Sequence, residues 1–246
     1  MAKFYPISYS GLKLYEGCPY SFYRQKIFEP KIKDTDLKPA LQRGIQIHKV
    51  LEDFVRKGEK IPDDYPQLIP VAGAITMFKE KNAGAKLEAE RSLYIDENYE
   101  AIKNKSSFES FFSSFINAKI DLTVTVGNFA FIKDYKTGKS KGDQAQLDMQ
   151  AGCLFANAPN LTHIKTQFVY VDTNSYSHEV MHTRDTVWNK ALKDRIDNYV
   201  YGLQKDIFPK RSTMPSFKDP TQQVDNSMCK FCPVTECEFN KRGSHG

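Results

Sequence analysis

The chain has 246 residues, of which 40% are hydrophobic and 13% aromatic, a composition that excludes a largely disordered protein. The length allows one large domain or two small ones. The 35 Lys and Arg residues outnumber the 30 Asp and Glu residues by five, which permits a nucleic-acid partner without requiring one. No apolar run approaches the roughly 20 residues that span a bilayer, and the N-terminus lacks the apolar core of a signal peptide. A cytoplasmic protein with no membrane partner is therefore expected.

The first third of the chain is predicted to be helical. Ser8 is a candidate N-cap, and Pro19 interrupts the helix that follows it. One segment carries a clear helical stripe of apolar side chains together with a histidine: Leu41, Ile45, His48 and Val55. The predicted helices of this part cover residues 9–17, 40–57 and 66–82, with a polar, proline-bounded loop over residues 29–39.

The middle of the chain changes to the two-residue period of β-strands. Turn residues at Gly127-Asn128 and Asn174-Ser175 separate β-rich runs. The predicted strands cover residues 86–96, 129–135, 162–171 and 176–182, and two further β-rich runs lie within 108–126. Helices are predicted over residues 143–156 and 184–205. This order predicts one α/β domain, with a mixed sheet flanked by helices.

Two acidic residues lie in a predicted strand–turn–strand segment. Asp121 follows one β-rich run, and Asp134 ends the next apolar strand. A short turn brings such strand ends side by side, where two carboxylates suit Mg²⁺ or Mn²⁺. Lys136 shares a strand face with Asp134 and can position water or offset the charge of a phosphate. The group predicts metal-assisted phosphodiester hydrolysis, although Asp-x-Lys by itself is more typical of a surface pair.

Further polar residues are candidates for the same site. His48 is a candidate third metal ligand, since imidazole suits Mn²⁺, although a histidine on an apolar face is more often a core residue. Glu90 is preferred over Glu88 to complete the site, the alternative for both being a solvated strand face. Gln146 and Gln150, four residues apart on a predicted helix, are candidates to hold a phosphate or to order the lysine, unless they face solvent.

The five cysteines cluster unevenly, and their odd number in a chain without a signal peptide argues against a disulfide framework. Cys229, Cys232 and Cys237 follow the pattern C-x2-C-x4-C and need a fourth ligand to close a metal site. Cys18 is the predicted fourth ligand, and it would clamp the two ends of the chain together. Either an iron–sulfur cluster or a zinc ion fits four thiolates, and Cys153 is predicted to be a buried free thiol.

In their order along the chain, these residues resemble the motifs of the PD-(D/E)XK nuclease superfamily. The likeness is to its RecB-like and AddB-like iron–sulfur branch, which includes the small CRISPR-associated exonucleases. The similar segments are ISYSGLKLYEGCPYSFY, RGIQIHKVLEDF, AKIDL, DYKTGK, QLDMQ and the terminal cysteines. Two positions depart from the pattern: Gln150 stands where the family has a tyrosine, and the last cysteine gap is one residue shorter.

The resemblance implies a restriction-endonuclease-like core with an N- and C-terminal helical iron–sulfur part, in which residues 1–28 and 207–240 form a cysteine staple of a single nuclease domain. It implies a Mg²⁺- or Mn²⁺-dependent deoxyribonuclease, an exonuclease rather than an endonuclease, in a bacterial, archaeal or phage-infected cell. The implied catalytic residues are Asp121, Asp134, Lys136, Glu90 and Gln146. The implied metal contacts are His48, Asp121, Asp134 and Tyr135, and a 4Fe-4S cluster would be bound by Cys18, Cys229, Cys232 and Cys237.

The expected partner is DNA that contains a single-stranded segment, together with proteins of recombination or replication. The expected role is the processing of DNA ends in recombination, repair or phage DNA metabolism. Lys139, Lys141 and Arg43 are candidate contacts to the DNA backbone. The alternative is an inactive or zinc-stapled nucleic-acid-binding protein on the same fold.

Overall fold

The computed structural model describes residues 5–29, 39–103, 106–138, 141–211, 214 and 226–240. The chain divides into two compact units. We call Leu37–Leu192 the sheet unit. Met1–Asp36 combines with Lys193–Gly246 in the other, which we call the cysteine unit because it contains four of the five cysteines. Within the described part of the chain, no helix is long and apolar enough to cross a membrane.

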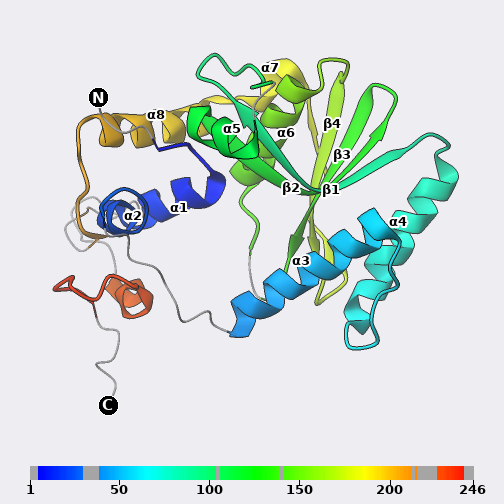
Figure 1. Cartoon of the computed structure of the whole chain (residues 1–246), viewed down its shortest axis with the longest axis horizontal. Helices are drawn as coiled ribbons and strands as arrows, with labels where there is room; N and C mark the ends of the chain where they lie inside the picture. The colour runs from blue at the N-terminus through cyan, green and yellow to red at the C-terminus, as the bar shows by residue number, and fades with distance from the viewer. Residues whose placement is uncertain are drawn as a thin grey trace. The chain divides into compact units, whose positions relative to one another are not determined.

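The sheet unit is built on a mixed six-stranded sheet (Figure 1). Three strands form an antiparallel meander: β1 (Lys86–Ile95), β2 (Ile116–Val126) and β3 (Phe129–Lys136). β3 pairs in parallel with β4 (His163–Tyr170), and a parallel pair needs a crossover, which α6 (Gln144–Asn157) supplies. The short strands β5 (Ser175–Tyr176) and β6 (Val180–His182) pair with β4. The predicted mixed sheet with flanking helices is confirmed.

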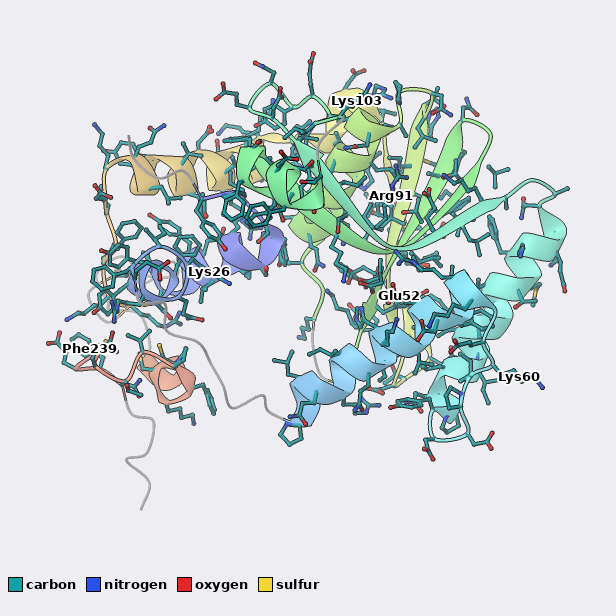
Figure 2. The ribbon with its side chains drawn as sticks, in the orientation of Figure 1. Lys26, Glu52, Lys60, Arg91, Lys103 and Phe239 are labelled. Carbon is teal, nitrogen blue, oxygen red and sulfur yellow. The ribbon has the colours of Figure 1, made fainter. Side chains whose placement is uncertain are left out.

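Helices cover both faces of this sheet. α6 contacts β1 to β4 on one face, and α3 (Pro39–Lys57) and α4 (Ile69–Lys81) lie over the other (Figure 1). A short turn of helix, η1 (Pro66–Leu68), leads into α4. The core between α3, α4 and the sheet is apolar, and its side chains are drawn in Figure 2. Its buried members from α3, η1 and α4 are Ile47, Leu51, Leu68, Val71 and Ile75.

The buried face of α3 differs from the stripe that the sequence suggests. Ile47 and Leu51 are buried, whereas Leu41 and Ile45 are 54% and 55% exposed. The first two turns of α3 are exposed around most of their circumference, so these apolar side chains have no core to enter. Periodicity detects an apolar stripe but does not say which part of a helix the sheet will cover.

Two further predictions need correction. The first run within 108–126 is not a strand but the helix α5 (Ser107–Ser113), because Ser106 and Glu109 form a reciprocal capping box. The predicted helix over 184–205 is two helices, α7 (Arg184–Val187) and α8 (Lys190–Gln204). They are separated at Trp188, which has non-helical dihedral angles, and the Asn189 side chain accepts a bond from the Leu192 N–H.

The cysteine unit has an aromatic core. α1 (Tyr9–Gly17) and α2 (Pro19–Lys26) pack against α8, with the rings of Tyr15, Phe22 and Tyr199 in edge contacts of 5.1–5.8 Å between centroids. Ser8 caps α1 by accepting a bond from the Gly11 N–H, as predicted. The C-terminal segment contains the short helix η3 (Asn226–Phe231).

A close approach of α6 to Trp188 generates a stability prediction. A Cβ added at Gly152 would lie 2.3 Å from the indole ring, so Gly152→Ala forces the ring or the helix to move. We expect a loss of about 1–3 kcal/mol in the free energy of unfolding, measured by urea denaturation. Gly73→Ala in α4 is the matched control, because no described atom lies within 4 Å of its added Cβ. The control should be neutral or stabilising by up to about 1 kcal/mol, and an equally stable Gly152→Ala would contradict the packing.

Candidate active site

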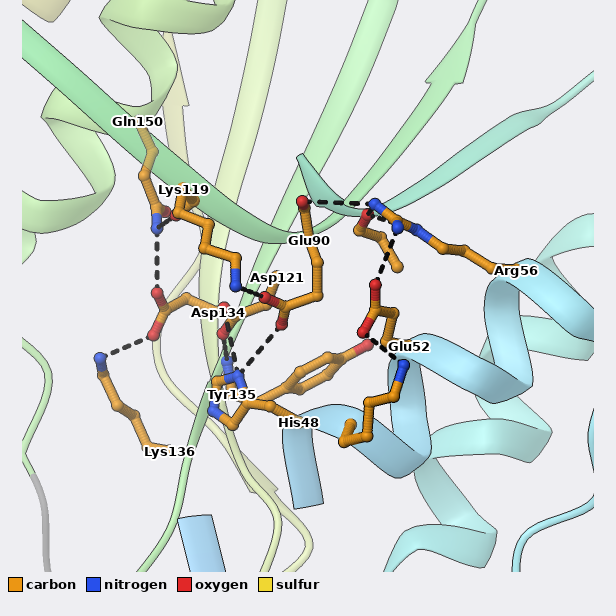
Figure 3. Close-up of polar contacts among 12 residues, drawn as sticks. His48, Glu52, Arg56, Glu90, Lys119, Asp121, Asp134, Tyr135, Lys136 and Gln150 are labelled. Atoms are coloured by element: carbon orange, nitrogen blue, oxygen red, sulfur yellow. Dashed lines mark hydrogen bonds and ion pairs between the residues drawn. The ribbon is translucent and has the colours of Figure 1, made fainter. Parts of the chain in front are cut away.

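Three carboxylates stand in one row across β1, β2 and β3. The β1–β2 ladder pairs the residues on either side of Glu90 with those on either side of Asp121, so these two acids are opposite each other. Asp121 and Asp134 occupy the position next to the last pair of the β2–β3 ladder, Leu122 with Lys133. Neighbours in such a row lie close together. The register alone therefore gathers the three acids (Figure 3).

The backbone of β1 is distorted at Glu90. Its φ of 51° is in the left-handed region, which is unfavourable for a residue with a side chain, by about 1–3 kcal/mol. Arg56 of α3 stabilises the distortion, because its guanidinium donates to the carbonyl of Ala89 at 2.6 and 3.1 Å and to that of Glu90 at 3.4 Å. Arg56 is itself paired with Glu52 (Figure 3). The distorted strand holds the Glu90 side chain beside α3.

His48 reaches the row from α3. Its Nδ1 lies 3.3 Å from Asp121 Oδ1 and 3.4 Å from Glu90 Oε1 (Figure 3). Burial lowers the pKa of the imidazole, but hydrogen bonds to the two carboxylates outweigh it and raise the pKa to about 10. One ligand atom from each of His48, Glu90 and Asp121 lies within 4.8 Å of the others, so together they can hold one metal ion. One imidazole and two carboxylates suit Mn²⁺ or Mg²⁺.

Asp134 is outside this group of three and has other partners. Its Oδ1 accepts bonds from Gln146 at 2.6 Å and Gln150 at 3.0 Å, both from α6. Burial and the charge of Asp121 raise the pKa of Asp134, and the ammonium of Lys136 partly offsets them. The paired glutamines on α6 therefore face the site rather than solvent.

Two lysines flank the row of acids. Lys136 Nζ lies 2.7 Å from Asp134 Oδ2, donates to Gln146 Oε1 at 2.8 Å, and sits 5.0 Å from the centre of the Phe168 ring. Its side chain is only 15% exposed, so its position is well defined. Lys119, on β2, pairs with Glu90 at the other end of the row. The acids are thus held between two ammonium groups and the imidazole.

A glycine lets α3 approach the end of β3. A Cβ at Gly44 would lie 3.2 Å from the hydroxyl oxygen of Thr137, the residue after β3. The glycine stands four residues before His48, one helical turn away on the same side of α3. This contact gives a physical reason for the four-residue spacing of Gly44 and His48 in the segment RGIQIHKVLEDF: the small residue brings the helix close enough for the imidazole to reach the acids.

The remaining residues that the sequence suggests for the site lie in different environments. Tyr135 donates its backbone N–H to Asp121 at 2.7 Å, while its ring is buried in the core, so any metal contact from this residue would come from its main-chain oxygen. The Arg43 guanidinium pairs with Asp172, which also accepts a bond from the Gly138 N–H. Lys141 is exposed, and Lys139 lies outside the described residues.

The four candidate cluster ligands line a single cavity in the cysteine unit. Its volume is about 250 Å³, and Cys18, Cys229, Cys232 and Cys237 contribute to its wall. Cys18 caps α2 by accepting a bond from the Ser21 N–H, and the Ser21 hydroxyl is 3.4 Å from the Cys232 sulfur. Burial and the neighbouring cysteines raise the pKa of Cys18 and Cys229. Cys153 is buried in α6, and burial raises its pKa strongly.

Several residues of the site lack a sequence signal. Arg56 belongs to none of the motif-like segments, and Lys119 lies within AKIDL without a role that the resemblance assigns to it. The sequence makes Gln150 a candidate without fixing its role, and in the structure its amide donates to Asp134 and to the carbonyl of Lys119. Its position one helical turn after Gln146 was the available signal.

The group of His48, Glu90 and Asp121 generates a binding prediction. We expect the protein to bind Mn²⁺, and Glu90→Gln to weaken binding about tenfold or more by removing a charged oxygen ligand. Calorimetric titration with MnCl₂ measures both affinities. Glu88→Gln on the same strand is the matched control, since Glu88 pairs with Lys86 and Arg91 instead. Equal weakening by both variants would contradict the assigned group.

Comparisons with known proteins identify a family for this chain. The chain matches the family model of the PD-(D/E)XK nuclease superfamily over residues 6–237. A comparison with curated protein sequences gives no significant match. Among solved structures, a putative exonuclease from Eubacterium rectale is 14% identical, with a TM-score of 0.49 and coverage of 91% of this chain and 90% of that one.

A second similar structure is an alkaline exonuclease from Laribacter hongkongensis, 12% identical, with a TM-score of 0.31 and coverage of 77% of this chain and 93% of that one. Because these identities and TM-scores are low, the assignment depends on the family model, which spans nearly the whole sequence. The chain belongs to the PD-(D/E)XK nuclease superfamily.

Proposed function

We propose that this protein is a metal-dependent deoxyribonuclease, and that it works as an exonuclease on DNA ends in recombination, repair or phage DNA metabolism. The observation that carries the proposal is the juxtaposition of a three-ligand metal group with a fixed lysine. The metal group lines an open cleft of about 470 Å³, to which His48, Glu90 and Asp121 contribute. Asp134 lies next to Asp121 on the neighbouring strand β3, which also carries Lys136.

The protein residues have separate roles in the proposed hydrolysis. A divalent cation at His48, Glu90 and Asp121 would polarise the phosphate and lower the pKa of a bound water. Lys136 provides a cationic donor for the attacking water or a phosphate oxygen, and Asp134 and Gln146 orient it at 2.7 and 2.8 Å. Because its side chain is largely buried, this orientation is prepared before substrate binds. Gln150 completes the support of Asp134.

The cleft suits a phosphodiester chain better than a small molecule. It is open to solvent, and Lys49 and Lys119 lie on its wall beside the acids. Lysine side chains are general contacts for phosphates of nucleic acids. The net charge of +5 favours the approach of a polyanion.

A 4Fe-4S cluster held by Cys18, Cys229, Cys232 and Cys237 is proposed as a structural cofactor of the cysteine unit. Support comes from the cavity of about 250 Å³ that the four thiols line. Four cysteines are the usual ligands of a four-iron cluster, and a zinc ion, which four thiolates also bind, is the alternative cofactor. The cluster would join Cys18 to the C-terminal segment and so contribute to folding.

The activity is tested by a Mn²⁺-dependent digest of linear single-stranded, linear duplex and closed circular DNA. An exonuclease should degrade both or one of the linear forms and leave the circle intact. Lys136→Ala should lower the cleavage rate at least about a hundredfold, as expected for a positioned catalytic group, with DNA affinity nearly unchanged. Lys79→Ala on α4 is the matched control and should cleave like wild type. A Lys136→Ala variant that cuts at the wild-type rate would overturn the catalytic assignment.

The cluster is tested by colour and stability. Protein purified without oxygen should be brown, and Cys18→Ser should be colourless and protease-sensitive because one ligand is lost. Cys153→Ser, at a cysteine that does not line the cavity, should remain brown and folded. A colourless wild-type protein containing one zinc per chain would exclude the cluster, and loss of colour in Cys153→Ser alone would show that the ligand set is wrong.

A further inference from the structure

The apolar side chains that α3 exposes lie in the candidate active-site cleft. Leu41 and Ile45 line the same cleft as His48, Glu90 and Asp121. An α-helix turns about 100° per residue, so Leu41, Ile45 and His48 fall within a narrow sector of one helix face. Ile47 and Leu51, which enter the core, are centred about 120° around the helix from Leu41 and Ile45. The cleft therefore has a metal group at one point and an apolar strip, Leu41 with Ile45, running away from it along α3.

The strip is held in place by polar contacts on the residues beside it. Arg43 forms a two-bonded ion pair with Asp172 after β4, and Asp172 also accepts a bond from the Gly138 N–H. Gly44 lies against Thr137. The exposed turns of α3 are thus tied to the segments that follow β3 and β4, so the strip has a fixed position relative to Lys136.

The chemistry of the cleft identifies what this strip contacts. Phosphates of a bound strand are attracted to the metal group and to the lysines, but an apolar side chain gains nothing from a phosphate. The apolar surfaces of a nucleic acid are the faces of its bases, which are stacked out of reach in an intact duplex and accessible in an unpaired strand. With a rise of 1.5 Å per residue, Ile45 and Leu41 are about 4.5 and 10.5 Å along the helix from His48. This is within reach of the nucleotides that neighbour a phosphate at the metal group.

We propose that Leu41 and Ile45 contact the unpaired bases next to the scissile phosphate, and that single-stranded DNA ends are therefore the preferred substrate. The proposal rests on the nuclease function proposed above and adds a substrate class and two specificity residues to it. The strip does not distinguish one base from another, because every base has an apolar face. It selects for the absence of base pairing.

The test compares an ordinary single-stranded oligonucleotide with one in which the nucleotides flanking the cleavage position are abasic. The abasic strand keeps every phosphate and removes only the base faces. Wild-type protein should cleave the ordinary strand, and bind it in Ca²⁺ by fluorescence anisotropy, about five- to tenfold better than the abasic strand. Leu41→Ala with Ile45→Ala should lose this difference, with unchanged Mn²⁺ affinity and thermal stability.

The matched control is Ile69→Ala with Met77→Ala on α4, which removes two similarly exposed apolar side chains, 59% and 52%, that do not line the cleft. The control should discriminate like wild type. A strip variant that still discriminates, or a wild-type protein that treats the two strands alike, overturns the inference and leaves the nuclease function standing. Base-dependent binding that is lost in the strip variant, in a protein that cleaves no DNA, would overturn the nuclease function and support the strip.

Discussion

The repulsion among three carboxylates in one row is the constraint on which the site depends. The strand register places Glu90, Asp121 and Asp134 side by side, and like charges at such spacing destabilise a sheet. Each acid therefore has a cationic partner: Lys119 for Glu90, His48 for Asp121 and Glu90, and Lys136 for Asp134. The amides of Gln146 and Gln150 add donors to the most buried acid. A divalent cation would satisfy the same electrostatic demand at His48, Glu90 and Asp121, the three residues whose ligand atoms lie close enough to hold one.

The row of acids makes the sheet less stable than apolar residues at the same three positions would. Glu90 adopts an unfavourable left-handed φ, and Asp134 is buried with a raised pKa. Both features cost free energy that the rest of the sheet unit must supply, through the apolar core under α3 and α4. Such local violations of ordinary folding preferences concentrate at functional sites. The stability of the core and the geometry of the site therefore depend on the same helix, because α3 carries both Leu51, which is buried in the core, and His48.

Sequence reasoning reached the parts of this site that depend on local pattern. Asp121, Asp134 and Lys136 follow from a hairpin and a two-residue strand period, and His48 from its place on a helical stripe. It could not choose firmly between Glu88 and Glu90, because that choice depends on a distorted strand held by Arg56 from another element. It assigned a strand to the residues of α5 although Ser106 and Glu109 carry a capping-box signal. The sequence does not indicate which side of α3 enters the core, because apolar residues lie on two sides of the helix.

Those two sides give α3 a role beyond that of a core helix. Ile47 and Leu51 fix the rotation of the helix about its own axis by entering the core. Once that rotation is fixed, 3.6 residues per turn place His48, Ile45 and Leu41 on the cleft side with no further freedom. The position of the imidazole and the position of the apolar strip are thus set by the same packing contact. A change in volume at Leu51 would rotate both together, so the proposed metal binding and the proposed contact with bases cannot be adjusted independently through the core. Only substitutions on the exposed turns of α3 can alter the strip while leaving the metal group in place.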